Sequence, residues 1–366
     1  MSLSSDNNQQ KQSNFSTLKN IVLIGGGDLM AASAKIFHDL NFNITIIAAT
    51  RHINEQLVLA NETLAQTCQQ LSLTQHVIND INHLSKQQLG AIIPNKAMAI
   101  CFGPAWVFSE KIIQEFHYGM FNINAIPIPH YLGGAHYTWQ LLNNNREGGC
   151  FFQQITHKLD QGDIFAKHQF TISEQASTPH EYFIENVKQG GHFIEKLARM
   201  FIQGDTFSPS SYSLLNEDRL YFPRLRTNKQ GYINWQWSAS EIVSFCQGFD
   251  DPYIGAASFV DKKILRFKKV ELTSLTDDNN NKIAPMHPFC TGIIIRKTIK
   301  KTQSTSSTNI IVAAINGFIE LGAVTDHHGR CMKSDLKEGM RLHTPQSVLE
   351  EAMTYQVIID GQGFKD

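Results

Sequence analysis

The sequence predicts an α/β protein: a mostly parallel sheet, followed by a second and smaller β domain. In the first half of the chain, short apolar runs alternate with helical stretches, which is the pattern of strands joined by crossover helices. In the second half, short β runs follow one another at regular spacing, which is typical of a small barrel. A chain of 366 residues is long enough for about two such domains.

The elements of the first domain follow from its apolar runs. Strands are predicted at 20–24, 43–48, 97–102 and 120–124, and helices at 29–40, 55–71, 109–117 and 137–143. Two further strands, at 150–156 and 163–172, are expected to form an antiparallel pair. An amphipathic helix at 179–203, interrupted at Gly190-Gly191, is expected to pack across the sheet.

The glycine run 25–27 after the first strand predicts the tight strand-to-helix turn of a Rossmann-like sheet. A dinucleotide fingerprint needs Gly-x-Gly-x-x-Gly, and Met30 stands where the third glycine belongs. A turn explains these glycines without a cofactor, so nicotinamide binding is disfavoured.

The second domain is predicted to follow a Ser/Pro-rich linker. One helix at 238–248 precedes strands at 257–260, 264–270, 292–296, 309–315 and 317–324, and the Lys/Thr/Ser-rich stretch 300–307 is expected to be a solvated hairpin loop. The predicted division is a disordered lead-in at 1–18, a catalytic domain at 19–204, a linker at 205–220, an OB-like barrel at 221–345 and a tail at 346–366.

Composition narrows the class of protein. A net charge of -1 gives no general preference for nucleic acid or an anionic membrane, and no apolar run approaches the roughly 18 residues of a spanning helix. Cys101 and Cys150 stand in apolar runs, which suits buried thiols in a cytoplasmic protein. His327 and His328 are expected to point apart, so no metal site is predicted.

The most informative stretch pairs two side-chain amides with a later carboxylate. Asn122 and Asn124 are two residues apart on a predicted strand, so both should project from one face. Polar groups at the end of a strand in an α/β pattern indicate a ligand crevice. Leu-Asp160-Gln-Gly-Asp163 then forms the predicted hairpin tip, although this sequence also suits a simple turn.

These motifs resemble the folate-dependent formyltransferases. The resemblance rests on Asn122, Pro129, Gly133 and the segment 159–163 in register, preceded by the segment 101–108. Further along, residues 232–242 and 249–253 are similar to the start of the C-terminal barrel domain of this family. The resemblance covers about residues 19–345, and it implies transfer of a formyl group from 10-formyltetrahydrofolate to a primary amine, with no metal.

The family's catalytic set is Asn, His and Asp, which the resemblance places at Asn122, Asn124 and Asp160. Asn122 suits donation to an oxyanion, and Asp160 suits acceptance of a proton. Asn124 replaces the histidine and cannot carry charge. Three interpretations stay open: a slower site with a neutral donor, substitution by His130 or His136, or a homologue that binds folate or substrate without catalysis.

The resemblance also implies a pterin pocket. Its residues are Gly103, Trp106, Val107 and Phe108 on one side, and the segment from Thr156 to Asp160 on the other. Backbone groups between apolar side chains suit a flat, amide-edged ring. Core packing is an alternative role for Trp106 and Phe108.

The expected acceptor is a small-molecule amine, such as an amino group on a nucleotide-linked sugar. The loop 49–56 contains a single arginine, and the basic run 262–269 suits a solvated strand face, so a nucleic-acid partner is disfavoured. Formylation of methionyl-tRNA remains an alternative. Whether the second domain binds substrate or forms a homodimer is left open.

Overall fold

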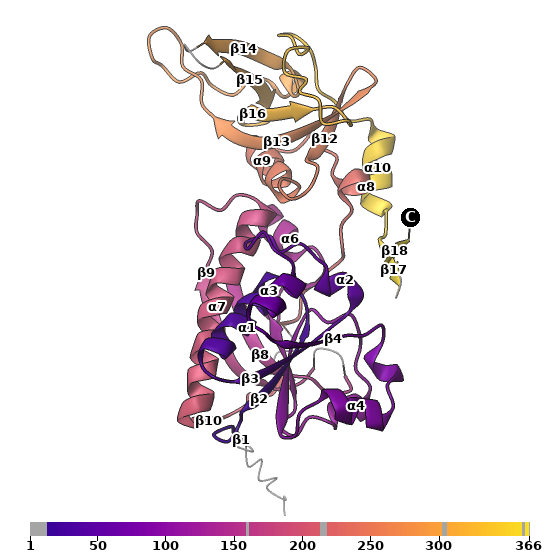
Figure 1. Ribbon diagram of the computed structural model, residues 1–366. Coiled ribbons are helices and arrows are strands. Elements are labelled where there is room, and N and C mark those ends of the chain that lie inside the picture. The colour runs from indigo at the N-terminus through magenta and orange to yellow at the C-terminus, as the bar shows by residue number, and fades with distance from the viewer. Residues whose placement is uncertain (1–12, 159–160, 213–217, 302–305, 361–362, 366) are drawn as a thin grey trace, which may run out of the picture. The chain divides into compact units, whose positions relative to one another are not determined.

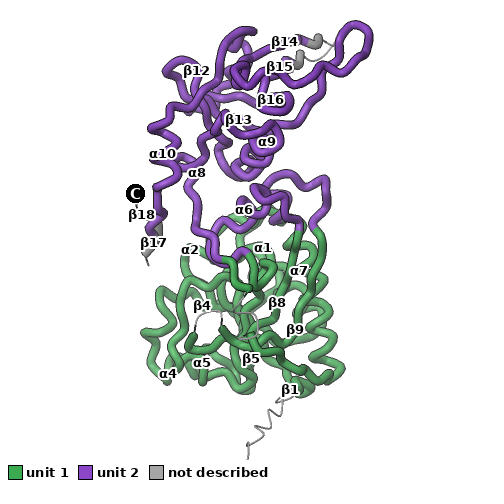
Figure 2. Tube along the Cα trace, turned by 180° about the vertical axis from the view of Figure 1, so that it is seen from behind, with its two compact units in different colours: residues 1–130, 147–171, 184–220 green, residues 131–146, 172–183, 221–366 purple. Residues whose placement is uncertain are grey.

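The computed structural model describes residues 13–158, 161–212, 218–301, 306–360 and 363–365 (Figure 1). The chain divides into two compact units, each assembled from several segments (Figure 2). Unit 1 comprises residues 1–130, 147–171 and 184–220, and unit 2 comprises residues 131–146, 172–183 and 221–366.

Unit 1 is built on a seven-stranded sheet, as the α/β pattern predicts. The first five strands in spatial order pair in parallel. The last two pairings, of the sixth strand with the fifth and of the seventh with the sixth, are antiparallel. The direction of strand order reverses between β2 and β5, which is the switch point of a doubly wound sheet. The spatial order is β4 (Thr74–Val77), β3 (Asn43–Ala48), β2 (Asn20–Gly25), β5 (Ala97–Phe102), β6 (Met120–Asn124), β8 (Glu147–Gln154) and β9 (Ile164–Thr171).

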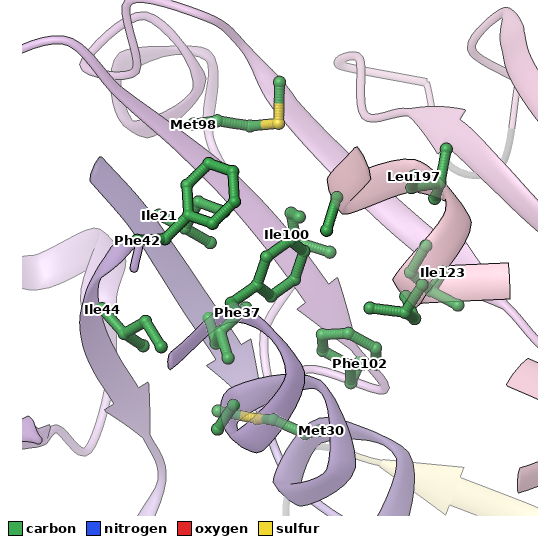
Figure 3. Close-up of a cluster of buried hydrophobic side chains, with 14 of the residues drawn as sticks. Ile21, Met30, Phe37, Phe42, Ile44, Met98, Ile100, Phe102, Ile123 and Leu197 are labelled. Carbon is green, nitrogen blue, oxygen red and sulfur yellow. The ribbon is translucent and has the colours of Figure 1, made fainter. Parts of the chain in front are cut away.

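Helices cover both faces of this sheet. Side chains of α1, α3 and α7 share one buried cluster with the sheet, and side chains of α4 and α5 share another. Figure 3 shows part of the first cluster, where Phe37 of α1 lies beside Ile100 of β5, and Leu197 of α7 lies on the side of Ile123 of β6. The helices of unit 1 are α1 (Asp28–Asp39), α2 (Thr50–Ile53), α3 (Leu64–Gln70), a 3-10 turn (Ile81–His83), α4 (Lys86–Ile92), α5 (Glu110–Ile113) and most of α7 (Pro179–Gln203).

Three predicted helices differ from the structure. The helix expected at 55–71 begins only at Leu64, because the backbone N–H groups of Val58 and Leu59 donate to the Asp28 carboxylate and hold that segment in turns. The helix expected at 109–117 is the shorter α5. Helix α7 continues through Gly190, where a Cβ would lie 2.8 Å from Leu29 Cδ1, so this glycine permits close packing instead of a break.

The disordered lead-in predicted at 1–18 includes residues that the structure places in a strand and in the core. Ser13–Asn14 (β1) pairs with Thr206–Phe207 (β10), and Phe15 is only 4% exposed. The Phe15 ring contacts the rings of Phe121, Phe201 and Phe207. Residues 13–18 and 206–207 therefore belong to unit 1, and the linker predicted at 205–220 starts within it.

Unit 2 contains a five-stranded antiparallel sheet. Residues 339–343 bridge its two ends: Phe259 and His343 exchange backbone hydrogen bonds of 2.8 and 2.9 Å, and Ile294 N–H donates to the Met340 carbonyl at 2.8 Å. This segment returns the sheet on itself, as the predicted barrel requires. The strand order is β12 (Ala256–Val260), β13 (Lys263–Thr273), β16 (Gly317–Thr325), β15 (Ser306–Ala314) and β14 (Ile294–Lys301).

Helix α9 (Ala239–Gly248) contributes to the core of this sheet, and Ser238 caps it with Glu241 in a capping box. Strands β14 and β15 extend into the loop predicted at 300–307, of which residues 302–305 lie outside the described part. The domain boundaries near 204, 220 and 345 stay predictions. The other elements of unit 2 are β7 (Leu132–Gly133), α6 (His136–Leu142), β11 (Tyr221–Phe222), α8 (Thr227–Gln230), a 3-10 turn (Pro288–Cys290), α10 (Gln346–Thr354), β17 (Ile358–Asp360) and β18 (Gly363–Lys365).

Three smaller expectations can be compared with the structure. Cys101 and Cys150 are fully buried free thiols, as predicted. The rings of His327 and His328 do not point apart: their centroids are 3.7 Å apart. Within the described ranges, no three His, Cys, Asp or Glu side chains are grouped to hold a metal, and no helix has the length and hydrophobicity to cross a membrane.

Replacing Phe15 by alanine tests whether this N-terminal segment belongs to the core. A buried phenylalanine at the centre of an aromatic cluster should cost about 3–5 kcal/mol of unfolding free energy when truncated, measured by urea denaturation. Val58→Ala is the control, because Val58 is 51% exposed and should change stability by less than about 0.5 kcal/mol. Equal stabilities for the two variants would contradict the assignment of residues 13–18 to unit 1.

Candidate active site

An open cavity of about 260 Å³ lies in unit 1, beside the central strand β6. Two chain segments form most of its wall, the loop 104–108 after β5 and the segment 153–158 at the end of β8. Asn122 of β6 also lines it. The cavity therefore brings together Asn122, the loop 104–108 and Thr156, all of which the sequence singled out.

Asn122 is held at the cavity by its place in the sheet. It pairs with Cys101 of β5 on one side and with Gln153 of β8 on the other. Its neighbours Phe121 and Ile123 belong to the opposite hydrophobic cluster, as strand alternation requires. The Asn122 Oδ1 atom is buried without a hydrogen-bond partner among the described residues. A buried amide oxygen without a partner is costly, so it is an atom prepared for a ligand.

The two asparagines point to the same face and contact each other. Asn122 Nδ2 donates to Asn124 Oδ1 at 2.6 Å, and Asn124 Nδ2 donates to Gln153 Oε1 at 2.8 Å. Gln153 Nε2 in turn donates to the backbone carbonyl of Gly162 at 2.9 Å. Four groups thus form one chain of hydrogen bonds that ends at Asn122. Asn124 does not line the cavity; it lies behind Asn122 in this chain.

Hydrogen bonds with Asn82 and Asn79 fix the loop after β5. Asn82 Nδ2 donates to the Val107 carbonyl at 3.0 Å, and Asn82 Oδ1 accepts from Ser109 N–H at 2.9 Å. Trp106 Nε1 donates to the Asn79 carbonyl at 2.8 Å. These bonds hold the loop open beside the cavity.

The apolar residues of this loop divide between two roles. Phe108 is 7% exposed and belongs to the hydrophobic cluster on this face of the sheet, so it both packs in the core and lines the cavity. Val107 is 69% exposed and offers an apolar surface to a ligand. Gly103, with φ +50°, gives the chain its turn out of β5 and is not part of the cavity wall.

The opposite wall leads to the predicted hairpin tip. Thr156 Oγ1 accepts from Lys158 N–H at 3.3 Å and forms a local turn at the cavity. Leu159 and the predicted catalytic Asp160 lie outside the described residues. The described residues resume at Gln161. At the next residue, Gly162, a Cβ would lie 1.8 Å from the Gln154 carbonyl oxygen, so only glycine fits this close approach.

His130 and His136, the two histidines that could take the place of the one missing at position 124, belong to different units. His130 is in unit 1 and does not line the cavity; its Nδ1 lies 3.4 Å from Glu147 Oε2. His136 begins α6 in unit 2, where burial and then the Arg224 guanidinium lower the pKa of His136 to about 4. His136 is therefore a neutral imidazole at pH 7 and cannot supply a positive charge.

Sequence reasoning missed Gln153 and Asn82. Gln153 is 1% exposed, an unusual position for a glutamine, but nothing in its sequence neighbourhood distinguishes it from Gln154. The signal exists only in the strand pairing, which sets Gln153 opposite Asn122. Asn82 lies 25 residues before Val107, and no spacing rule connects them.

The described wall can act chemically through neutral amides. An amide N–H can stabilise a developing oxyanion, and the free Oδ1 of Asn122 can accept a proton donor such as an amine. Lys158 is the only lysine or arginine among the residues of the described wall, and it is exposed.

Comparison with known proteins gives a consistent assignment. Residues 226–337 match the family described as formyl transferase, C-terminal domain. The methionyl-tRNA formyltransferase of Caldanaerobacter subterraneus subsp. tengcongensis is 26% identical over 188 residues, which is 51% of this chain and 58% of that protein. The chain therefore spans less than two thirds of this curated relative.

Two solved structures share the fold. A sugar 3N-formyl transferase, WlaRD, determined in the presence of dTDP and 5-N-formyl-THF, has a TM-score of 0.55 at 17% identity and covers 83% of this chain and 97% of its own. The N-formyltransferase of Helicobacter canadensis, in complex with folinic acid and dTDP-3-aminofucose, has a TM-score of 0.54 at 15% identity and covers 83% and 98%.

Replacing His136 by glutamine should flatten the pH dependence of stability. Because the folded pKa lies below the ordinary value of 6.5, the unfolded chain binds more protons between pH 6.5 and about 4, and stability falls as pH falls through this window. His136→Gln should reduce that slope by up to about 1 kcal/mol per pH unit in urea unfolding. His83→Gln is the control, since the His83 side chain is 85% exposed, and equal slopes in both variants would exclude a neutral buried His136.

Proposed function

We propose that this chain is a formyltransferase, and that it transfers a formyl group from 10-formyltetrahydrofolate to the primary amine of a small molecule. The observation that carries the proposal is Asn122 in the wall of a cavity in unit 1, with a side-chain Oδ1 that is buried and has no hydrogen-bond partner among the described residues. Asn122 and the segment 104–108, which belong to the motifs that resemble the family, line this cavity.

The reaction requires three functions of the protein. The neutral amine attacks the formyl carbon, a C–N bond forms and the carbonyl oxygen becomes an oxyanion. The bond from the formyl carbon to N10 of the folate then breaks, and N10 receives a proton while the amine loses one. The site must hold the amine, stabilise the oxyanion and move that proton.

Asn122 suits the first two functions. We assign its Oδ1, which is buried and has no hydrogen-bond partner among the described residues, to accept a hydrogen bond from the attacking amine. Its Nδ2 carries two hydrogens, of which one is used by Asn124, so the second can be donated to the oxyanion. Asp160 is assigned to the proton transfer by its place in the motif, and it lies outside the described residues.

The cavity also suits the pterin ring of the donor. Segments 104–108 and 154–158 present backbone beside the apolar side chains of Trp106 and Val107, which fits a flat ring with an amide-like edge. Lys158, on the exposed side, offers a positive charge for the carboxylates of the folate glutamate.

Asn124 is assigned a supporting role instead of direct contact with the reacting atoms. It donates to Gln153 and accepts from Asn122, and it is not part of the cavity wall. The family histidine contributes charge at this position, whereas Asn124 contributes only orientation. We therefore expect an active but slower enzyme, since charged hydrogen bonds are roughly twice as strong as neutral ones.

A nucleotide-linked aminosugar is the acceptor that we favour. Two proteins with the same fold were determined with dTDP or a dTDP-linked aminosugar. The basic run on β13 gives little support to tRNA: Leu265 and Phe267 enter the core, Lys268 pairs with Asp251 at 2.5 Å, and Arg266 donates to the Gly255 carbonyl. Lys262, Lys263 and Lys269 are exposed, whereas Arg266 and Lys268 are partly buried, so the basic residues of the run are not all on a solvated face.

Replacing Asn122 by alanine should lower kcat for formyl transfer by about 100- to 1000-fold, because it removes the oxyanion donor. The assay is single-turnover consumption of 10-formyltetrahydrofolate with a panel of dTDP-aminosugars. Asp160→Asn tests the proton acceptor in the same assay.

The matched control for these variants is Asn43→Ala. Asn43 starts β3, is exposed and hydrogen-bonds Asn20 on the same sheet, so its removal should leave turnover unchanged. Unchanged turnover in both Asn122→Ala and Asp160→Asn would remove the catalytic assignment. Folate binding without turnover by the unmodified protein would instead identify a catalytically impaired homologue.

Asn124→His should raise kcat by about tenfold, because a neutral imidazole keeps one donor and one acceptor at this position, and its protonated form, which can only donate, adds positive charge. The pH profile of kcat is the diagnostic measurement: the variant should gain an ionisation near neutral pH that the unmodified enzyme lacks. A lower kcat with no new ionisation would show that the site is adapted to an amide here.

A further inference from the structure

We propose that Gln153 is a positioning residue: acting through Asn124, it fixes the direction in which the Asn122 carboxamide faces. The inference rests on the proposed formyl transfer for its consequence in catalysis, while the hydrogen-bond geometry supports it independently. Gln153 is 1% exposed and crosses from β8 toward β6, whose Asn122 it faces in the strand pairing.

The direction is set at the far end of the chain of hydrogen bonds. A backbone carbonyl can only accept, so the group that faces the Gly162 oxygen must be the Gln153 NH2, at 2.9 Å. The Oε1 atom of Gln153 therefore faces the other way, toward Asn124. If the Gln153 amide were reversed, two acceptors would face each other in a buried place.

This orientation passes from one amide to the next. Gln153 Oε1 requires a donor, so Asn124 presents Nδ2 to it at 2.8 Å and turns Oδ1 toward Asn122. Asn124 Oδ1 in turn requires a donor, which is Asn122 Nδ2 at 2.6 Å. The consequence is that Asn122 Oδ1, which is buried, is left without a partner among the described residues. Within the described part of the chain, the Gly162 carbonyl is the fixed acceptor from which this series of three side-chain amides starts.

The arrangement explains how an asparagine can stand at position 124. The middle member of the chain must donate once and accept once, which an amide and a neutral imidazole both do. Charge is absent, but the direction of the Asn122 carboxamide is preserved. Without Gln153, Asn124 could turn its NH2 toward Asn122 and occupy the Oδ1 atom that the amine needs.

Gln153→Met is the first test, because methionine has a similar volume and makes neither bond. We expect kcat to fall about tenfold, as for a residue within a coupled hydrogen-bond network, while the Kd for 5-formyltetrahydrofolate changes by less than about threefold. Thr67→Val is the matched control: it removes a buried hydrogen bond to Glu62, 2.8 Å long, elsewhere in unit 1, and should leave kcat unchanged. An unchanged kcat in Gln153→Met would overturn the proposal.

Gln153→Glu separates orientation from packing. A protonated carboxyl donates once and accepts once, as glutamine does, whereas an ionised carboxylate can only accept. The ratio of the variant's kcat to that of the unmodified enzyme should therefore rise as pH falls, with both enzymes measured at each pH to cancel titration of His157 and Lys158 in the same wall. A ratio that stays flat or falls toward acid pH would contradict the proposal.

A third measurement needs neither the formyl donor nor the acceptor amine. In protein labelled with 15N-asparagine, the side-chain NH2 signals of Asn122 are identified by their loss in Asn122→Ala. Gln153→Met should shift these signals and speed their hydrogen exchange, although Gln153 makes no direct bond to Asn122, and Thr67→Val should not. Unmoved signals would refute the proposed orientation. If the signals move but no acceptor is formylated, the proposed function fails and the positioning role of Gln153 stands.

Discussion

The pairing of β6 with both of its neighbours is the constraint on which the site depends. On one side β6 continues the parallel sheet, and on the other it begins the antiparallel part. One line across these three strands therefore contains Cys101, Asn122 and Gln153. A slip of one residue in either pairing would turn Asn122 into the opposite hydrophobic cluster and separate it from Gln153. Backbone hydrogen bonds thus hold the two amides in place before any ligand arrives.

Neutral amides form the hydrogen-bond chain that ends at Asn122, and the energetics of such a chain differ from those of a buried charge. A buried charge needs a partner and costs solvation, whereas buried amides need only complete hydrogen bonding. In the hydrogen-bond chain from the Gly162 carbonyl to Asn122, each amide is bonded to the next, and Asn122 Oδ1 is buried without a partner among the described residues. Leaving a buried oxygen without a partner is costly, and this is the basis on which we propose that a ligand donates to Asn122.

Much of the fold could be predicted from local pattern. The strands at 43–48, 97–102 and 120–124 and the helix at 179–203 have the predicted bounds, because each is a continuous apolar or amphipathic run. Predictions failed where a distant contact overrides local preference. The Asp28 carboxylate holds Val58 and Leu59 out of a helix, and the aromatic cluster around Phe15 orders a polar N-terminal segment. Neither partner can be identified from sequence spacing.

The sequence by itself determined the α/β class, the single face shared by Asn122 and Asn124, and the resemblance to the formyltransferases, because all three follow from residue order along one strand or motif. Only the tertiary structure decided that Asn124 lies behind Asn122, that Gln153 completes the chain, and that residues 339–343 bridge the ends of the second sheet. The reason is physical: the direction of a buried amide is set by its acceptor, and here that acceptor, Gly162, lies 38 residues beyond Asn124.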